Sequence, residues 1–197
     1  MSAQGGATIV GLKFRDGVVV AGERKASYGS FVVSVSVKKV FLLDKKIAVG
    51  FAGLVADAQG VLRMLREEAG YYRISVGREL GIKGIAKLLS NILYSYKAMP
   101  METEAIVGGL EGGKPVLIVI DPLGSLIEDD FAAIGTGATI AVGVLEESYK
   151  DGLSKDEAIE LALKSIRTAM KRDALSGGNI DLIVVSKEEV AERVYSG

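Results

Sequence analysis

The side chains best suited to chemistry in this 197-residue sequence are Lys39 and the pair Asp173 and Ser176, because the chain contains no histidine and no cysteine. Without imidazole, neither a Ser-His-Asp nor a Cys-His nucleophile can form. The usual zinc, haem and blue-copper sites also lose their main donors, and disulfides are impossible. Any acid–base or nucleophilic step must therefore use carboxylates, hydroxyls, lysines or a chain terminus.

Each of these candidates also has an ordinary structural explanation. One lysine of an adjacent pair, as in Lys38-Lys39, is usually a solvated surface charge, and the residue types favour that position here. A buried lysine would instead have a lowered pKa and could act beside a nucleophile. Asp173 and Ser176, followed by two glycines, also fit a plain helix end and loop. Gly53 ends a predicted strand before a helix, where its N–H could serve as an oxyanion donor.

The segment 135–140, Gly-Thr-Gly-Ala-Thr-Ile, stands between a predicted strand and a predicted helix, where a dinucleotide fingerprint would lie. Its sixth position is Ile140 instead of glycine or alanine, and the surrounding elements do not form a βαβ unit, so the phosphate-binding interpretation fails. The remaining interpretation of this segment is a tight turn between strand and helix, which could bring Thr136 near a functional centre. We therefore predict no cofactor and no metal.

Charge and hydropathy exclude other function classes. The chain has 24 Lys and Arg against 25 Asp and Glu, without a strongly basic stripe, which argues against a nucleic-acid partner. The longest aliphatic runs, such as Val116–Ile120, have the length of a strand and not of a membrane span. Residues 1–6 lack the basic start and apolar stretch of a secretory signal, so a cytoplasmic location is expected.

The pattern in the first half of the chain predicts strands followed by two helices. Strands are predicted over 8–14, 18–26, 40–43 and 46–51, as one antiparallel meander. Asp16-Gly17 between the first two is a hairpin signal. A helical apolar period over 55–75 and a second over 83–98, ended by Pro100, predict an antiparallel helix pair.

The second half again places strands before two helices and then ends on one further strand. Strands are predicted over 104–110, 115–120, 130–134 and 179–185, and helices over 139–150 and 155–172. Ser154 and Glu157 have the spacing of a capping box at the start of the last helix. Strands in runs and helices in pairs indicate a single α+β domain, built as a four-layer αββα sandwich of two mainly antiparallel sheets.

Segments spread over nearly the whole chain, in order and with matching spacing, resemble a β subunit of the archaeal-type 20S proteasome. They are Thr8-Ile-Val-Gly11-Leu12, Asp16-Gly-Val-Val-Val20, Lys38-Lys39-Val-Phe41, Ala52-Gly53-Leu-Val-Ala-Asp57-Ala58, Ile134-Gly-Thr-Gly137 and Arg172-Asp173-Ala-Leu-Ser176-Gly-Gly178. The resemblance implies the αββα fold of N-terminal nucleophile hydrolases, which matches the layers predicted above.

The resemblance also implies a chemistry that needs no histidine. In active members, removal of a propeptide exposes a threonine whose hydroxyl attacks the peptide carbonyl, while its own α-amino group, with a pKa of about 8, is the base. The resemblance assigns the role of the supporting lysine to Lys39 and that of its acidic partner to Glu23. It assigns the groups that support the amino terminus to Thr136, Asp173 and Ser176. The oxyanion N–H falls on Gly53.

The nucleophile position falls on Ala7, directly after Gly6, and alanine has no hydroxyl. Thr8 is a poor substitute, because one step along a strand turns its side chain to the other face. Glu23 replaces the aspartate usual in the family and is one methylene longer, which could displace the lysine. We therefore expect a silent subunit that keeps residues 1–6 as a propeptide-like stretch before the domain at 7–197.

The substrate pocket implied by the resemblance is apolar and would favour cleavage after hydrophobic residues. It comprises Ala26, Val37, Phe41, Phe51 and Val55. Phe51 could simply fill this pocket, and all five also fit ordinary core positions.

The function implied is that of a β-ring subunit in the 20S core of a protein-degradation complex, ATP-dependent through a partner ATPase. Expected partners are proteasome α subunits and other β subunits in stacked heptameric rings, a regulatory ATPase acting through the α rings, and unfolded substrates. The alternatives are an active threonine endopeptidase that uses Thr8, an unmutated parent with threonine at position 7, and a stand-alone hydrolase of the same fold.

Overall fold

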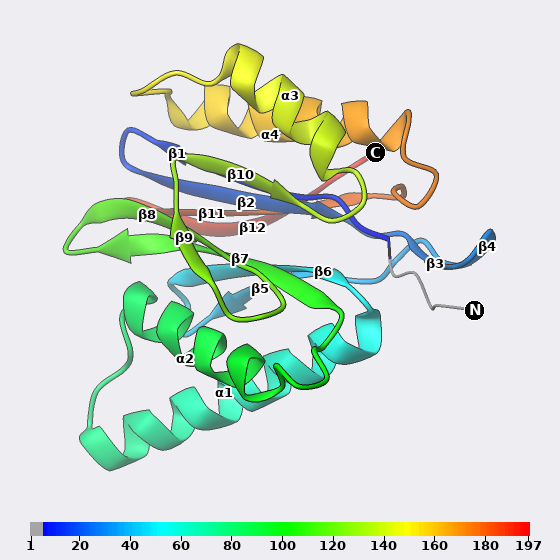
Figure 1. The fold of residues 1–197 in the computed structure, drawn as a ribbon. Helices are drawn as coiled ribbons and strands as arrows, with labels where there is room; N and C mark the ends of the chain where they lie inside the picture. Colours follow the sequence, from blue (N-terminus) through cyan, green and yellow to red (C-terminus); the bar gives the residue numbers. More distant parts are fainter. Residues whose placement is uncertain (1–5) are drawn as a thin grey trace.

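Two five-stranded antiparallel sheets lie face to face between two helix pairs in the computed structural model, which describes residues 6–197 (Figure 1). The first sheet has the order β10 (Phe131–Ile134), β1 (Ile9–Phe14), β2 (Gly17–Glu23), β11 (Ile180–Ser186) and β12 (Val190–Tyr195). The second has the order β5 (Val40–Leu43), β6 (Ile47–Gly53), β7 (Thr103–Glu111), β8 (Lys114–Ile120) and β9 (Leu126–Glu128). The predicted αββα sandwich is confirmed.

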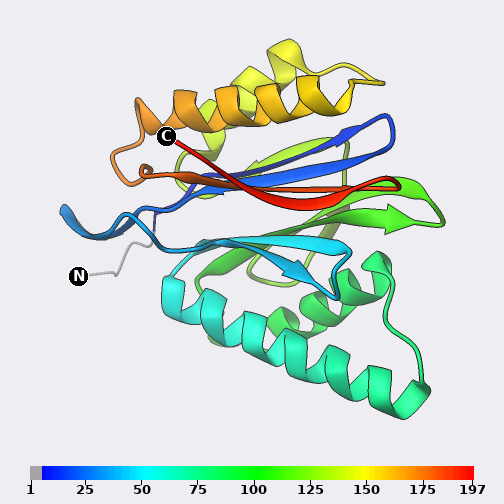
Figure 2. The ribbon, with the colours of Figure 1, turned by 180° about the vertical axis from the view of Figure 1, so that it is seen from behind.

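Each sheet is covered on its outer face by one helix pair (Figure 2). The helices are α1 (Val55–Val76) and α2 (Ile82–Ser95) on the second sheet, and α3 (Ala138–Ser148) and α4 (Lys155–Met170) on the first. A separate hairpin of β3 (Ala26–Tyr28) and β4 (Phe31–Ser34) projects from the end of the sandwich that also holds the start of the described chain.

The two-residue period of β1 explains how the layers are joined. Val10 and Leu12 belong to the apolar cluster beneath α3 and α4, whereas Ile9 belongs to the cluster between the two sheets. Successive strand residues point to opposite faces, so one strand serves both layers. The same alternation fixes which side of the sheet each residue near the start of β1 can reach.

The predicted opening meander is wrong, because β5 and β6 belong to the second sheet and not to the sheet of β1 and β2. The predicted strand over 18–26 ends at Glu23 and is followed by the separate hairpin. The prediction also lacked β9 and β12, two edge strands. An edge strand needs only one ladder partner and little burial, so its sequence pattern is weak.

Local signals at turns and caps agree with the structure. Gly112 and Gly113, between β7 and β8, both have positive φ, 56° and 78°, as the tight hairpin turn between these strands requires. Ser154 and Glu157 form the predicted capping box at the start of α4. None of the helices formed by residues 6–197 combines the length and the apolar character that a membrane crossing requires.

Candidate functional site

The candidate centre surrounds Ala7, just before β1. Ala7 is 1% exposed and packs in the apolar cluster between the sheets. Its carbonyl oxygen accepts a hydrogen bond from the Gly137 N–H at 3.3 Å, and the oxygen of the Thr136 hydroxyl lies 3.4 Å from it. The turn before α3 therefore holds the backbone of residue 7, while the side chain at this position is only a methyl group.

Lys39 lies on one side of this position and is buried, with 7% of its side chain exposed. The prediction from residue types, a solvated lysine, is wrong for Lys39 and holds for its neighbour Lys38, which is exposed and forms an ion pair with Glu192. Burial lowers the pKa of the Lys39 ammonium, and the neighbouring Glu23 carboxylate opposes that shift.

The Lys39 ammonium donates three hydrogen bonds, to the Glu23 carboxylate, to the Lys25 carbonyl at 2.5 Å and to the Gly6 carbonyl at 3.2 Å. The last of these is the carbonyl of the peptide bond that precedes Ala7. Lys39 is therefore placed to polarise the bond between residues 6 and 7, and the longer Glu23 side chain does not prevent this contact.

Glu23 is completely buried and accepts hydrogen bonds on both carboxylate oxygens. One oxygen takes the Lys39 ammonium and the Thr8 N–H at 3.3 Å. The other takes the Lys25 N–H at 2.6 Å and the Gly177 N–H at 2.9 Å. This single carboxylate thus joins the start of β1, the chain after β2 and the loop after α4.

Asp173, Thr136 and Ser176 form a second polar group next to residue 7. One Asp173 oxygen accepts from the Thr136 hydroxyl and from the Ser176 hydroxyl, each at 2.6 Å. Ser176 is also 2.7 Å from the Thr8 hydroxyl. Because a hydroxyl has one proton and Ser176 uses it toward the carboxylate, Thr8 is the donor to Ser176.

The Thr8 side chain points to the face of β1 that packs against α3 and α4, the face shared with Val10. Its hydroxyl contacts Ser176 and not Lys39. The close approach of the Gly137 backbone leaves no room for a Cβ there, since an added Cβ would lie 2.0 Å from the Thr8 hydroxyl oxygen. Thr8 is therefore enclosed on the side away from the lysine.

Gly53, the predicted oxyanion donor, ends β6 immediately before α1. Its φ is +115°, and an added Cβ would lie 2.1 Å from the Glu102 carbonyl oxygen. Only glycine fits a position with both constraints. The backbone can therefore turn here from the second sheet into the helix, beside the predicted pocket.

Four of the five predicted pocket residues line one cavity, which has a volume of only about 20 Å³. These are Val37, Phe41, Phe51 and Val55, together with Lys39 and Gly53. The Phe51 ring is buried and lies 6.4 Å from the Phe41 ring, centre to centre. Ala26, the fifth, does not line the cavity and is buried at the start of β3. The volume is about that of one water molecule.

Comparison with known families matches residues 3–185 to the proteasome subunit family. The chain belongs to the proteasome subunit family. It is 45% identical to "Proteasome subunit beta 1" of Staphylothermus marinus over 95% of this chain and 88% of that protein. It is 48% identical to "Proteasome subunit beta 1" of Hyperthermus butylicus (93% and 91% covered) and 44% identical to "Proteasome subunit beta 2" of Pyrobaculum neutrophilum (97% of both).

The groups of this site that the sequence did not predict belong to the backbone. The carbonyls of Gly6 and Lys25 bind Lys39, and the N–H groups of Lys25 and Gly177 bind Glu23. Side-chain motifs carry no signal for such partners. The described part of the chain also contains no cluster of three or more Asp and Glu residues placed to hold a metal ion.

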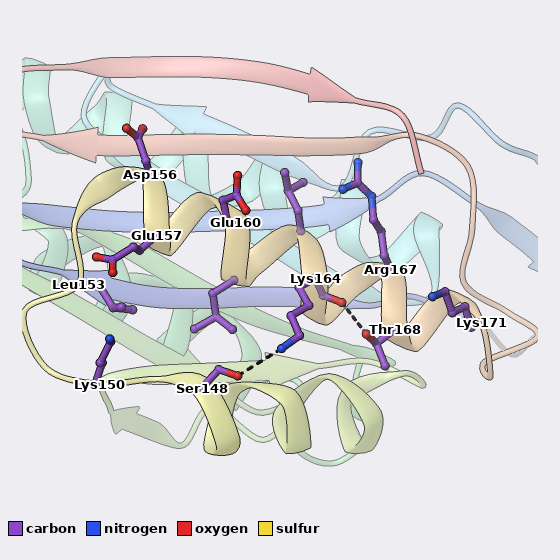
Figure 3. A pocket seen from close by; sticks show the side chains of 12 residues that line it. Ser148, Lys150, Leu153, Asp156, Glu157, Glu160, Lys164, Arg167, Thr168 and Lys171 are labelled. Atoms are coloured by element: carbon purple, nitrogen blue, oxygen red, sulfur yellow. Dashed lines mark hydrogen bonds between the residues drawn. The ribbon is translucent and has the colours of Figure 1, made fainter.

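A surface hollow of about 770 Å³, larger than the cavity at Phe51, lies elsewhere, across the outer face of α4 (Figure 3). Its labelled side chains include Glu160, Lys164 and Arg167, which come from α4. None of the predicted site residues lines this hollow. Size alone therefore does not mark the candidate centre.

Proposed function

We propose that this chain is a β-ring subunit of a 20S proteasome core particle and that its own peptidase centre is silent. Membership of the family and the relatives named proteasome subunit beta support the first part. One observation carries the second part: residue 7, which the lysine and the carboxylate groups surround, is alanine. Active peptidase sites of the particle then belong to other chains.

The chemistry fails at two linked steps. A threonine at position 7 would attack the Gly6 carbonyl, which Lys39 contacts, and would transfer the acyl group to its own hydroxyl. Water would then release residues 1–6 and free the α-amino group that serves as the base. Ala7 has no oxygen to attack, so the Gly6–Ala7 bond remains and no free amino group arises there. Nucleophile and base are lost together.

Two further observations support silence. The Thr8 hydroxyl donates to Ser176 on the opposite face of the strand, which leaves it without the lysine that a nucleophile needs. The cavity at Phe51, about 20 Å³, is also too small for a Leu or Phe side chain of a bound peptide. A restored nucleophile would therefore lack a preformed pocket for large apolar residues.

The proposed role is structural: the chain forms part of the β rings and of the wall of the degradation chamber. Its proposed partners are proteasome α subunits and other β subunits, and unfolded protein chains pass along its inner surface. A regulatory ATPase acts through the α rings, so this chain itself needs no nucleotide. The proposed location of this complex is the cytoplasm.

Mass spectrometry of the chain's N-terminus in the assembled particle tests the proposal, combined with a covalent inhibitor directed at N-terminal threonine. We expect a chain that still carries the Gly6–Ala7 bond and no label. A mature chain that begins at Thr8 and takes up the inhibitor would overturn the silent assignment.

An Ala7→Thr variant tests the proposed cause. We expect cleavage between residues 6 and 7 in this variant. We expect no cleavage in Ala7→Val, because valine has nearly the shape of threonine but no hydroxyl. Adding Lys39→Ala to Ala7→Thr should block the cleavage again. A folded Ala7→Thr chain that stays uncut would show that silence has another cause than the missing hydroxyl.

A further inference from the structure

An ion pair between Arg24 and Asp181 joins the segment that holds Lys39 to β11. Arg24 belongs to the short connection between β2, which ends at Glu23, and β3, which begins at Ala26. Its Nε–H donates to one Asp181 oxygen at 2.9 Å, and an Nη2–H donates to the other oxygen. Such a fork fixes the orientation of the two groups as well as their distance, which a single lysine ammonium does not do.

The Asp181 carboxylate is buried, with 6% of its side chain exposed. Asp181 lies two residues before Ile183 on β11, and Ile183 belongs to the apolar cluster between the two sheets. Residues two apart on a strand share a face, so the Asp181 side chain points toward that layer. An unpaired charge buried there would strongly destabilise the fold. Arg24 supplies the cation, and the hydrogen bond with Asp181 raises the pKa of the guanidinium.

The backbone of Arg24 is also held on both sides. Its N–H donates to the Gly177 carbonyl at 3.2 Å, and its carbonyl accepts from the Val37 N–H at 2.9 Å. Val37 precedes Lys39 by two residues, and Gly177 also donates its N–H to Glu23. Arg24 therefore connects the end of β2, the loop after α4 and the chain that leads to Lys39.

Both neighbours of Arg24 in the chain supply acceptors to the Lys39 ammonium. Glu23 supplies a carboxylate oxygen, and Lys25 supplies its carbonyl oxygen at 2.5 Å. A shift of Arg24 therefore moves two of these acceptors at once. A further acceptor is the Gly6 carbonyl at 3.2 Å. The position of the ammonium against the Gly6 carbonyl thus depends on where the connection after β2 is anchored.

We propose that Arg24 and Asp181 are positioning residues, whose ion pair anchors the connection after β2 so that Lys39 stays on the Gly6 carbonyl. The proposal deepens the proposed function, because it rests on residue 7 being the place where Lys39 would act. A pair that only stabilises the fold can be replaced by apolar side chains of similar volume. A positioning pair cannot, since apolar contacts do not fix a direction as a hydrogen-bonded fork does.

The test replaces the ion pair by apolar side chains in the full chain, as Arg24→Met/Asp181→Leu. Because such exchanges often keep the stability of a fold, the midpoint of urea unfolding should stay close to that of the wild type. The pKa of Lys39, measured by NMR of the lysine side chains, should fall by about one unit or more, because the ammonium loses acceptors that favour its charged form. An unchanged or higher Lys39 pKa in the folded variant would overturn the proposal.

The other charged groups that act on Lys39 stay in this variant. They are Glu23, Asp173 and Lys25. Arg24→Lys keeps the charge of the ion pair but replaces the fork by one ammonium, so the Lys39 pKa should fall by a smaller amount. This single variant becomes the deciding measurement if the apolar variant does not fold.

A matched control removes another ion pair in the same way. Lys13 of β1 and Asp130 are 3.1 Å apart and do not belong to the connection after β2. Lys13→Met/Asp130→Leu should therefore leave the Lys39 pKa unchanged. An equal fall of this pKa in the control would show that the effect is general and would overturn the specific role of the Arg24 pair.

Self-cleavage gives a second readout. In an Ala7→Thr chain, adding Arg24→Met/Asp181→Leu should slow cleavage between residues 6 and 7 by about tenfold or more, because a small displacement of a polarising group costs this much. Adding the control pair of substitutions should leave the rate unchanged. Equal rates with and without the Arg24 pair would contradict the positioning role.

These outcomes are separable from those of the proposed function. An Ala7→Thr chain that stays uncut refutes the proposed cause of silence, and the Lys39 pKa in the chain with Ala7 still decides the role of the ion pair. If Ala7→Thr is cut but the Lys39 pKa does not respond to loss of the ion pair, the positioning role is refuted and the silent assignment stands.

Discussion

The polar centre and the small cavity beside it share Lys39 but differ in how they are filled. In the polar centre, Glu23 accepts four donors and Asp173 accepts two hydroxyls and one N–H, so these carboxylates are extensively hydrogen-bonded. In the cavity, the rings of Phe41 and Phe51 leave about 20 Å³. One region keeps a buried, hydrogen-bonded polar network around residue 7, whereas the other is packed like ordinary core.

The difference has a physical reason. The polar groups hold three chain segments together, so removing them costs stability whether or not the site cuts peptides. A nucleophile hydroxyl and an empty apolar pocket serve catalysis alone, and an unfilled pocket lowers packing in the folded state. A silent subunit can therefore lose the nucleophile hydroxyl and the open pocket and keep its fold. Loss of the buried polar groups would destabilise the fold.

The largest effect is expected from Lys39→Met, which leaves the buried Glu23 carboxylate without its cation. The free energy of unfolding should fall by up to about 5 kcal/mol. Urea unfolding followed by circular dichroism measures it. Adding Glu23→Gln should recover most of the loss, because the amide is neutral and its oxygen still accepts N–H donors. An equal loss in the double variant would contradict the role given to the charge pair.

Phe51→Ala should come next and acts on the other region. Removing a buried aromatic ring should cost about 3–4 kcal/mol and enlarge the cavity. Calorimetry with a small apolar ligand such as benzene should detect binding to the variant and none to the wild type. Phe51→Leu is the control, with a smaller loss and no binding. A loss below about 1 kcal/mol would show that the ring is not packed as core.

Ser176→Ala should cost about 1–3 kcal/mol, because it removes the acceptor of the buried Thr8 hydroxyl and one donor to Asp173. Thr8→Val removes the donor of the same hydrogen bond, the Thr8 hydroxyl. In a double-mutant cycle measured by chemical unfolding, the combined loss should be smaller than the sum. Strict additivity would argue against a connected chain from Thr8 to Asp173.

Ser154→Ala provides a reference outside both regions. It removes the hydroxyl that caps α4, and the unfolding free energy should fall by about 1 kcal/mol. The Glu157 pKa, which the Ser154 backbone N–H and hydroxyl hold below its usual value, should rise in the variant. Carbon-detected NMR titration measures that pKa, and an unchanged value would contradict the capping-box geometry.

The smallest effect is a pH dependence. Burial lowers the pKa of Lys39 in the folded chain, so between that pKa and the unfolded value of 10.5 the unfolded state binds more protons. Stability gained from this group should therefore rise with pH through that window. The difference in unfolding free energy between wild type and Lys39→Met, measured from neutral to alkaline pH, should grow. A difference that shrinks would place the Lys39 pKa above its unfolded value.

Much of the fold follows from local pattern. The helical periods over 55–75 and 155–172 and the capping box at Ser154 lie close to the observed α1 and α4. The edge strands β9 and β12 and the assignment of β5 and β6 to a second sheet did not follow. Sheet membership depends on partners far away in the sequence, which a local period cannot specify.

The sequence by itself determined which chemistry is available: no imidazole, no thiol, and a methyl group at residue 7. Family resemblance located the groups around that residue. Only the tertiary structure decided that Lys39 is buried, that Thr8 donates to Ser176 and that Phe51 closes the pocket. Burial and hydrogen-bond direction depend on residues brought together from distant parts of the chain, so no stretch of sequence holds them alone.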